Sequence, residues 1–166
     1  MIIVRIAGGL ANQMVTYAAG RSLAIYNNTP LKLDLSLYNK DKLRTYALHN
    51  LNIKAEIANE YDMNSIMGAY RVKPLFKLRR KALKLLKIPD MRFYKEPKTG
   101  GFDHNFFNLQ NNAYIKGEFL SRKYYQPIAD VLKQDFSIKP DLSQTTKKVI
   151  NKIHGCSSIG IHIRRG

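Results

Sequence analysis

Residues 2–35 read IIVRIAGGLANQMVTYAAGRSLAIYNNTPLKLDL, and this stretch decides the fold. Residues 2–6 form a short apolar run that ends near two glycines, as expected of a buried parallel strand. Residues 31–35 alternate in polarity, which is typical of a second strand. Between them, small and apolar residues recur at the spacing of one helical face: Val15, Ala18, Ala19, Ser22, Leu23 and Tyr26. The stretch therefore predicts a β-strand, an α-helix and a second parallel strand, and with them an α/β fold.

The loop between the first strand and the helix, residues 7–13, brings free backbone N–H groups to a helix N-terminus. Asn12 lies in a position to cap that helix. Gly8 and Gly9 do not have the GxGxxG spacing of a dinucleotide site, so a plain tight turn is the favoured interpretation of the two glycines.

The end of the chain, residues 157–166, reads SSIGIHIRRG. Its three isoleucines alternate with small or polar residues, which predicts a strand that leaves a preceding helix. Arg164, Arg165 and Gly166 follow this strand. Ligands of open α/β sheets bind outside the carboxyl ends of the strands, and guanidinium groups pair bidentately with phosphate oxygens, so an anion site is predicted here. The alternative is a solvated turn without a ligand.

Length and composition limit the possible classes of protein. A chain of 166 residues is long enough for one domain or slightly more. Cys156 is the single cysteine, which excludes an internal disulfide, favours a reducing compartment such as the cytoplasm and is expected to be a small buried hydrophobe. No run approaches the roughly 18 apolar residues of a membrane span, and the first residues lack the features of a signal peptide.

The net charge of +16 is concentrated in residues 71–95, which hold ten basic residues and one acid. Within them, residues 74–88 carry leucines at helical spacing with lysine and arginine on the other side. Two interpretations remain open: a basic amphipathic helix that lies on the anionic inner membrane, or a solvated helix that packs its leucines on the domain. Sedimentation with anionic vesicles at low salt would distinguish them.

The remaining segments suggest a domain boundary near Pro140. Residues 95–112 resemble a loop-rich connection, and residues 113–119 a strand. Pro127 suits the first turn of a helix, whose apolar face consists of Ile128, Ala129, Leu132 and Phe136. The aromatic residues of the connection are expected in the core or between domains, with a sugar-stacking platform as the alternative; they are Phe102, Phe106 and Phe107.

Together, the two ends of the chain resemble the bacterial galactoside α-1,2-fucosyltransferases. Residues 8–14, GGLANQM, are similar to the start of the family's GGLGNQMFQYA, and residues 162–166 match all but the last residue of the HxRRGD motif of fucosyltransferases. Residues 46–53 and 117–125 resemble two further landmarks, Y-x-L with F-N-I and G-Y-F-Q-S-x-K-Y-F, in the right order. The resemblance covers the whole chain.

The resemblance implies a glycosyltransferase of the GT-B type. Residues 1–139 would be its Rossmann-like N-terminal domain, and residues 140–166 would begin the C-terminal, GDP-fucose-binding domain with its first strand. The chain departs from the family's motifs: Ala11 replaces a glycine, Val15 and Thr16 replace Phe and Gln, and Glu118 and Leu120 replace Tyr and Gln. The aspartate of HxRRGD would follow Gly166. Because family members are nearly twice as long, we expect this chain to correspond to the N-terminal half of such an enzyme.

The implied reaction is transfer of L-fucose from GDP-β-L-fucose to the 2-hydroxyl of a galactose-terminated glycan, with inversion, in surface polysaccharide synthesis. Arg164 and Arg165 are the predicted catalytic residues, because charge grows on the departing diphosphate and losing such a donor costs about 10² to 10³ in rate. They also belong to the predicted donor-binding set, with His162, Gly166, Gly9, Asn12 and Gln13. For Asn12, capping explains the residue equally well, and a structural role is as plausible for His162.

The general base for the acceptor hydroxyl should be a carboxylate or a histidine. Glu118, Asp34 and the aspartate expected after Gly166 are candidates that the sequence does not rank. The chain has no Asp-x-Asp motif, so neither a metal nor a cofactor besides the donor substrate is expected.

Two other classes remain as alternatives. The first is an inactive or partner-dependent fragment of such an enzyme, which folds without completing a donor site. The second is a basic nucleic-acid-binding module, which the charge favours but the lack of aromatic residues among the basic ones disfavours, so no nucleic-acid partner is expected. Specific binding to nucleic acid that survives moderate salt would contradict this expectation.

Overall fold

The protein is an α/β domain built on one five-stranded parallel sheet, in the order β3-β2-β1-β5-β4. The computed structural model describes residues 1–71, 77–78, 81–83, 85–86, 91–97, 101–140, 142–161 and 163. The predicted α/β class with a Rossmann-like domain is confirmed. The strands are β1 (Ile2–Arg5), β2 (Leu31–Asp34), β3 (Glu56–Ile57), β4 (Phe93–Lys95) and β5 (Ala113–Lys116).

The predicted β-strand, helix and parallel strand form the centre of the fold. β1 pairs with β2 so that Ile2 lies opposite Leu31, and α1 (Leu10–Tyr26) connects them. The prediction that Asn12 caps the helix is wrong, because α1 begins earlier, at Leu10. Gly8 has a φ of 78°, which turns the chain there, and Gly9 is the extended N-cap residue with no side-chain cap.

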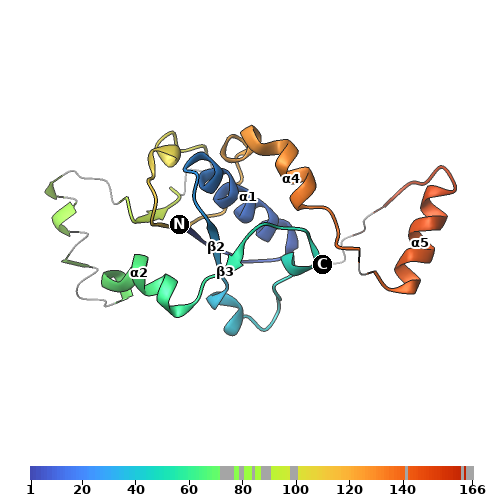
Figure 1. The fold of residues 1–166 in the computed structure, drawn as a ribbon, viewed down its shortest axis with the longest axis horizontal. Helices are drawn as coiled ribbons and strands as arrows, with labels where there is room; N and C mark the ends of the chain where they lie inside the picture. The colour runs from blue at the N-terminus through green and yellow to red at the C-terminus, as the bar shows by residue number, and fades with distance from the viewer. Residues whose placement is uncertain are drawn as a thin grey trace.

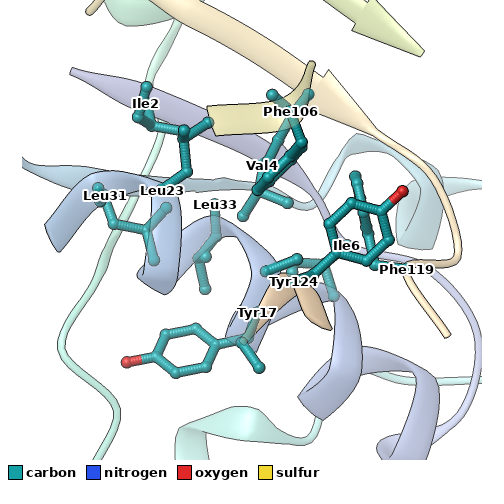
Figure 2. Packing of buried hydrophobic residues seen from close by; sticks show 14 of the residues in the cluster. Ile2, Val4, Ile6, Tyr17, Leu23, Leu31, Leu33, Phe106, Phe119 and Tyr124 are labelled. Atoms are coloured by element: carbon teal, nitrogen blue, oxygen red, sulfur yellow. The ribbon is translucent and has the colours of Figure 1, made fainter. Parts of the chain in front are cut away.

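The two faces of the sheet are covered by different helices. Alternate side chains of β1 and β2 point to the side of α1, where they form the main core with an aromatic cluster from residues 102–124 (Figure 2). Ile3 and Tyr114 lie in a second cluster with Ile66 and Met67 of α2 (Glu60–Arg71). The prediction that Phe106 belongs to the core is confirmed, since it is fully buried, and Phe102 and Phe107 pack against the same core.

α1 is buried on more sides than the predicted apolar face, because α4 (Ala129–Asp135) lies against it as well as the sheet. The Tyr17 hydroxyl donates to Asp135 at 2.6 Å, and Arg21 donates to the same carboxylate oxygen at 3.0 Å. Tyr26, the last residue of the predicted helical face, is 67% exposed. Short 3₁₀ helices complete the domain: η1 (Ser36–Asn39), η2 (Leu48–Asn50), η3 (Phe106–Asn108), η4 (Arg122–Tyr124) and η5 (Gln126–Ile128).

The segment after Pro140 differs from its prediction in two respects. Its helix, α5 (Gln144–His154), is capped by Ser143 and has no buried residue, and Figure 1 shows it apart from the sheet. The expected strand is wrong for residues 157–161 and 163, which are not in a strand: no neighbouring strand pairs with them, and Ile159 is 90% exposed. The prediction that Cys156 is buried is also wrong, because this residue follows α5 and is exposed like the helix itself.

The predicted basic helix of residues 74–88 lies largely outside the described residues. Its described parts, residues 77–78, 81–83 and 85, are helical, and Leu78 and Leu85 are exposed there. Across the part of the chain that is described, no helix combines the length and apolar character that a membrane crossing requires.

Candidate functional site

The candidate site is a cavity of about 530 Å³ at the carboxyl ends of three adjacent strands. It is lined by the end of β1, the end of β4 and the end of β5, together with the loops that follow them. Ligands of parallel α/β sheets bind at this edge, because the loops leave the strands there and the opposite faces are filled by helices. The volume lies within the range of small-ligand sites, about 300 to 1,000 Å³.

Charged side chains of both signs line this cavity. The cations are Arg5, Lys95 and Lys116, and the acids are Glu96 and Glu118. The Lys116 ammonium lies 4.5 Å from the centre of the Phe93 ring. Such a set suits a polar ligand that offers both hydroxyl groups and negative oxygens.

Gln13, a predicted donor-binding residue, is fully buried and joins two loops. Its Nε2 donates to the carbonyls of Gly8 at 3.0 Å and Thr45 at 2.8 Å, and its Oε1 accepts the backbone N–H of Ala47 at 2.8 Å. Both amide hydrogens are therefore engaged within the protein. This arrangement gives Gln13 a structural role, which sequence reasoning did not anticipate.

Gly9 and Asn12 lie at the exposed start of α1, beside the cavity rather than in its lining. A Cβ atom added at Gly9 would meet nothing within 4 Å, whereas one at Gly8 would lie 2.7 Å from Asn12 Nδ2. Asn12 therefore packs over the glycine turn. The loop lies next to the cavity because Ala7, two residues before Gly9, is one of the lining residues.

The remaining predicted site residues lie outside the described residues. They are His162, Arg164, Arg165 and Gly166. The catalytic and donor-binding roles assigned to them stay predictions.

The structure separates the two general-base candidates that it describes. Asp34 is buried, and its two oxygens accept from the Tyr114 hydroxyl at 2.6 Å and the Ser36 N–H at 2.9 Å. Burial, and then the bond to Asp34, raise the pKa of Tyr114 far above its ordinary value. Glu118 is exposed and lines the cavity. Of the two, Glu118 is the carboxylate that a ligand in the cavity can reach.

Sequence reasoning did not single out Arg5, Lys95, Glu96 or Lys116 as site residues. One signal was available: each lies at the last position of a predicted or observed strand, or directly after it, where ligands of α/β sheets bind. β4 was not predicted, so there was no reason to expect Lys95 and Glu96 at the edge of the sheet. Within the described residues, no group of three or more His, Cys, Asp or Glu side chains is arranged to hold a metal ion.

Comparison with known proteins agrees with an enzyme that acts on sugars. No family model matches the chain, and no solved structure matches it. Over 167 aligned residues that cover the whole chain, it is 25% identical to an alpha-1,2-colitosyltransferase of Escherichia coli. The chain spans about half of that relative, 54% of its length. The similarity supports a glycosyltransferase of related type.

Proposed function

We propose that this chain is part of an inverting α-1,2-fucosyltransferase, which transfers L-fucose from GDP-β-L-fucose to the 2-hydroxyl of a galactose-terminated glycan. The observation that carries the proposal is the similarity along the whole chain to an alpha-1,2-colitosyltransferase. The cavity at the carboxyl edge of the sheet supports it, because its volume lies in the range of small-ligand sites and charged side chains contribute to its lining. We place the reaction in surface polysaccharide synthesis.

The proposed reaction has one charge to stabilise. The acceptor oxygen attacks the anomeric carbon of fucose, the bond to GDP breaks, and negative charge grows on the leaving diphosphate. Arg164 and Arg165 are proposed to hold that diphosphate, since paired guanidinium groups match its oxygens. Gly9 and Asn12 are proposed to contact the donor from the start of α1, where backbone N–H groups favour an anion.

Glu118 is the proposed general base. It lines the cavity beside three cationic strand ends, so an acceptor bound there can place its hydroxyl against the carboxylate. The proton moves from the sugar hydroxyl to Glu118 as the oxygen attacks. Replacement of a positioned base typically lowers the rate by about 10² to 10⁴.

The experiment is a transfer assay with two donors, performed on a protein in which this chain is completed to the length of its relative. Colitose is fucose without its 3-hydroxyl group, so GDP-fucose and GDP-colitose offered with a galactoside acceptor compare the two sugars directly. We expect transfer of fucose, detected by the mass of the product. Transfer of colitose alone would correct the donor, and transfer of neither would refute the proposal.

A matched pair of variants tests the proposed base. Glu118→Gln keeps the size of the side chain but cannot accept the proton, so kcat should fall by about 10² or more. Glu60→Gln is the control, because Glu60 is an exposed acid in the first turn of α2, outside the cavity lining. Unchanged kcat in Glu118→Gln would exclude Glu118 as the base.

The second candidate is a fragment that folds but does not turn over. It is favoured by the chain spanning 54% of the relative. We expect the 166 residues alone to bind GDP-fucose weakly and to show no transfer. Calorimetric titration of GDP-fucose into this chain and into the longer protein measures the difference, and turnover by the short chain would contradict the expectation.

A further inference from the structure

Glu96 lies where two of the cavity's strands end. It follows β4 directly, and its backbone N–H donates to the Lys116 carbonyl at 2.9 Å. Its side chain crosses to the next loop, where Oε2 accepts the backbone N–H groups of Glu118 at 2.7 Å and Phe119 at 2.8 Å. Hydrogen bonds to a carboxylate are roughly twice as strong as those between neutral groups. One side chain therefore joins the loop after β5 to the end of β4.

The carboxylate reaches these two N–H groups because residue 117 has no side chain. A Cβ at Gly117 would lie 2.5 Å from both Cβ and Oε2 of Glu96. Carbon atoms in contact lie about 3.5 Å apart or more, so any other residue at this position would force the Glu96 side chain or the backbone to move. The position of the Glu96 side chain therefore requires glycine at residue 117.

The turn that Glu96 holds has an unusual backbone at Phe119. This residue has a φ of 50°, a conformation that bulky side chains rarely adopt and that persists only where the surroundings enforce it. Its ring is fully buried among aromatic rings, with its centre 5.2 Å from that of Tyr124 and 5.6 Å from that of Phe106 (Figure 2). Packing against other aromatic rings fixes the Phe119 ring, and the hydrogen bond to Glu96 fixes the Phe119 N–H.

This backbone sends neighbouring residues in opposite directions. Phe119 enters the core, whereas Gly117, Glu118 and Leu120 line the cavity. Release of the Phe119 N–H would leave its φ held only by ring packing. The direction of the Glu118 side chain would then no longer be fixed.

We propose that Glu96 is a positioning residue: it holds the turn of residues 117–120, and through that turn it fixes Glu118 at the cavity. The inference rests on the proposed function, because Glu118 is assigned the acceptor proton there. Glu96 itself receives no proton in the reaction. Its Oε2 atom already accepts the two backbone N–H groups.

Hydrogen exchange tests the turn without any activity. In Glu96→Ala, the amides of Glu118 and Phe119 should exchange at least about tenfold faster, because each loses its acceptor. Glu96→Gln retains one acceptor oxygen and should restore part of the protection. Amides of β5 report whether the sheet is intact. Unchanged exchange at Glu118 and Phe119 in Glu96→Ala, with β5 protected, would overturn the proposal.

Kinetics in the completed protein test whether Glu96 acts through Glu118. Glu96→Ala should lower kcat by about tenfold or more, since misplacement of a reacting group by about 1 Å can cost 10²-fold. In the Glu118→Gln background, the same substitution should change kcat less than twofold, because the group that it positions is already absent. Asp41→Asn is the control: Asp41 also accepts two backbone N–H groups, from Leu43 and Arg44, but lies outside the cavity lining.

The outcomes separate the two proposals. Equal losses from Glu96→Ala in both backgrounds would show that Glu96 does not act through Glu118, and would overturn the inference. A wild-type protein without any transfer would refute the proposed function. The exchange measurement would then still decide whether Glu96 holds the turn.

Discussion

At the scale of single residues, Gly8 and Gly9 have different tasks although they are adjacent. Gly8 has a positive φ, and its carbonyl accepts from both Gln13 at 3.0 Å and the Tyr38 hydroxyl at 2.9 Å. Gly9 has an ordinary extended backbone and open space where a Cβ would lie. The first glycine shapes the loop, and the second leaves its surface accessible.

The two glycines therefore predict effects of very different size from the same substitution. Gly8→Ala should lower the free energy of unfolding by roughly 1 to 3 kcal/mol, because alanine is strained at positive φ and its Cβ would lie 2.7 Å from Asn12. Gly9→Ala should change that free energy by less than about 0.5 kcal/mol. Urea denaturation of both variants measures the difference, and equal effects would contradict the assignment.

Gly9→Ala also examines the proposed donor contact. Because the substitution leaves the fold intact, weaker binding of GDP-fucose would indicate a close approach of the ligand to this residue. Unaltered binding would remove Gly9 from the donor site. The same comparison is not informative at Gly8, where the loop itself changes.

At the scale of elements, α2 depends on a buried acid at its start. Asp62 accepts the Asn59 N–H at 3.0 Å while the Asn59 side chain accepts the Asp62 N–H, and Lys32 of β2 donates to both Asp62 oxygens at 2.9 Å. The Asn59 N–H first, and Lys32 second, hold the pKa of Asp62 below its ordinary value. The bond to Asp62 in turn raises the pKa of Lys32.

This pair predicts an acid-sensitive helix contact. A carboxyl group whose pKa is lowered by folding stabilises the protein above its ordinary pKa, about 3.9, and loses that contribution as the pH falls through the lowered value. Asp62→Asn should therefore be less stable than the wild type at pH 7, and the gap should close below about pH 4. Asp130→Asn, at an exposed pair with Lys133, is the control and should show little effect at either pH.

The elements also show why some predictions succeeded and others did not. β1, α1 and β2 follow each other directly, so periodicity alone was sufficient to predict them. β4 is three residues long and its pairing with β5 joins positions about twenty residues apart, which no local pattern reports. The strand expected at residues 159–163 has the right alternation, but alternation does not supply the neighbouring strand that its N–H and C=O groups require.

At the scale of the whole molecule, three buried tyrosines donate hydrogen bonds to aspartates, two of which lie far away in the sequence and one nine residues away. The hydroxyl groups of Tyr17, Tyr94 and Tyr114 donate to Asp135 at 2.6 Å, Asp103 at 2.9 Å and Asp34 at 2.6 Å. Burial first, and the aspartate second, raise the pKa of each tyrosine well above its ordinary value. Each hydroxyl therefore stays protonated to a higher pH in the folded domain than in the unfolded chain.

These tyrosines predict cooperative unfolding in alkali. A tyrosine whose pKa is raised by folding stabilises the protein below its ordinary pKa, about 10, and that contribution is lost as the pH rises further. Ultraviolet titration should show a late ionisation phase that coincides with loss of the far-ultraviolet circular dichroism. In urea, all ten tyrosines should titrate in one phase near pH 10. A single phase in the folded protein would contradict this prediction.

The sequence by itself determined the α/β class and the central β-strand, helix and parallel strand, because these depend on the periodicity of neighbouring segments. Only the tertiary structure decided which side chains meet at the carboxyl edge of the sheet. Glu96, Glu118 and Arg5 lie far apart in the sequence and share one cavity because parallel pairing brings the ends of β4, β5 and β1 together. Likewise, the buried bonds of Gln13 exist only because the fold brings residues 45 and 47 beside it.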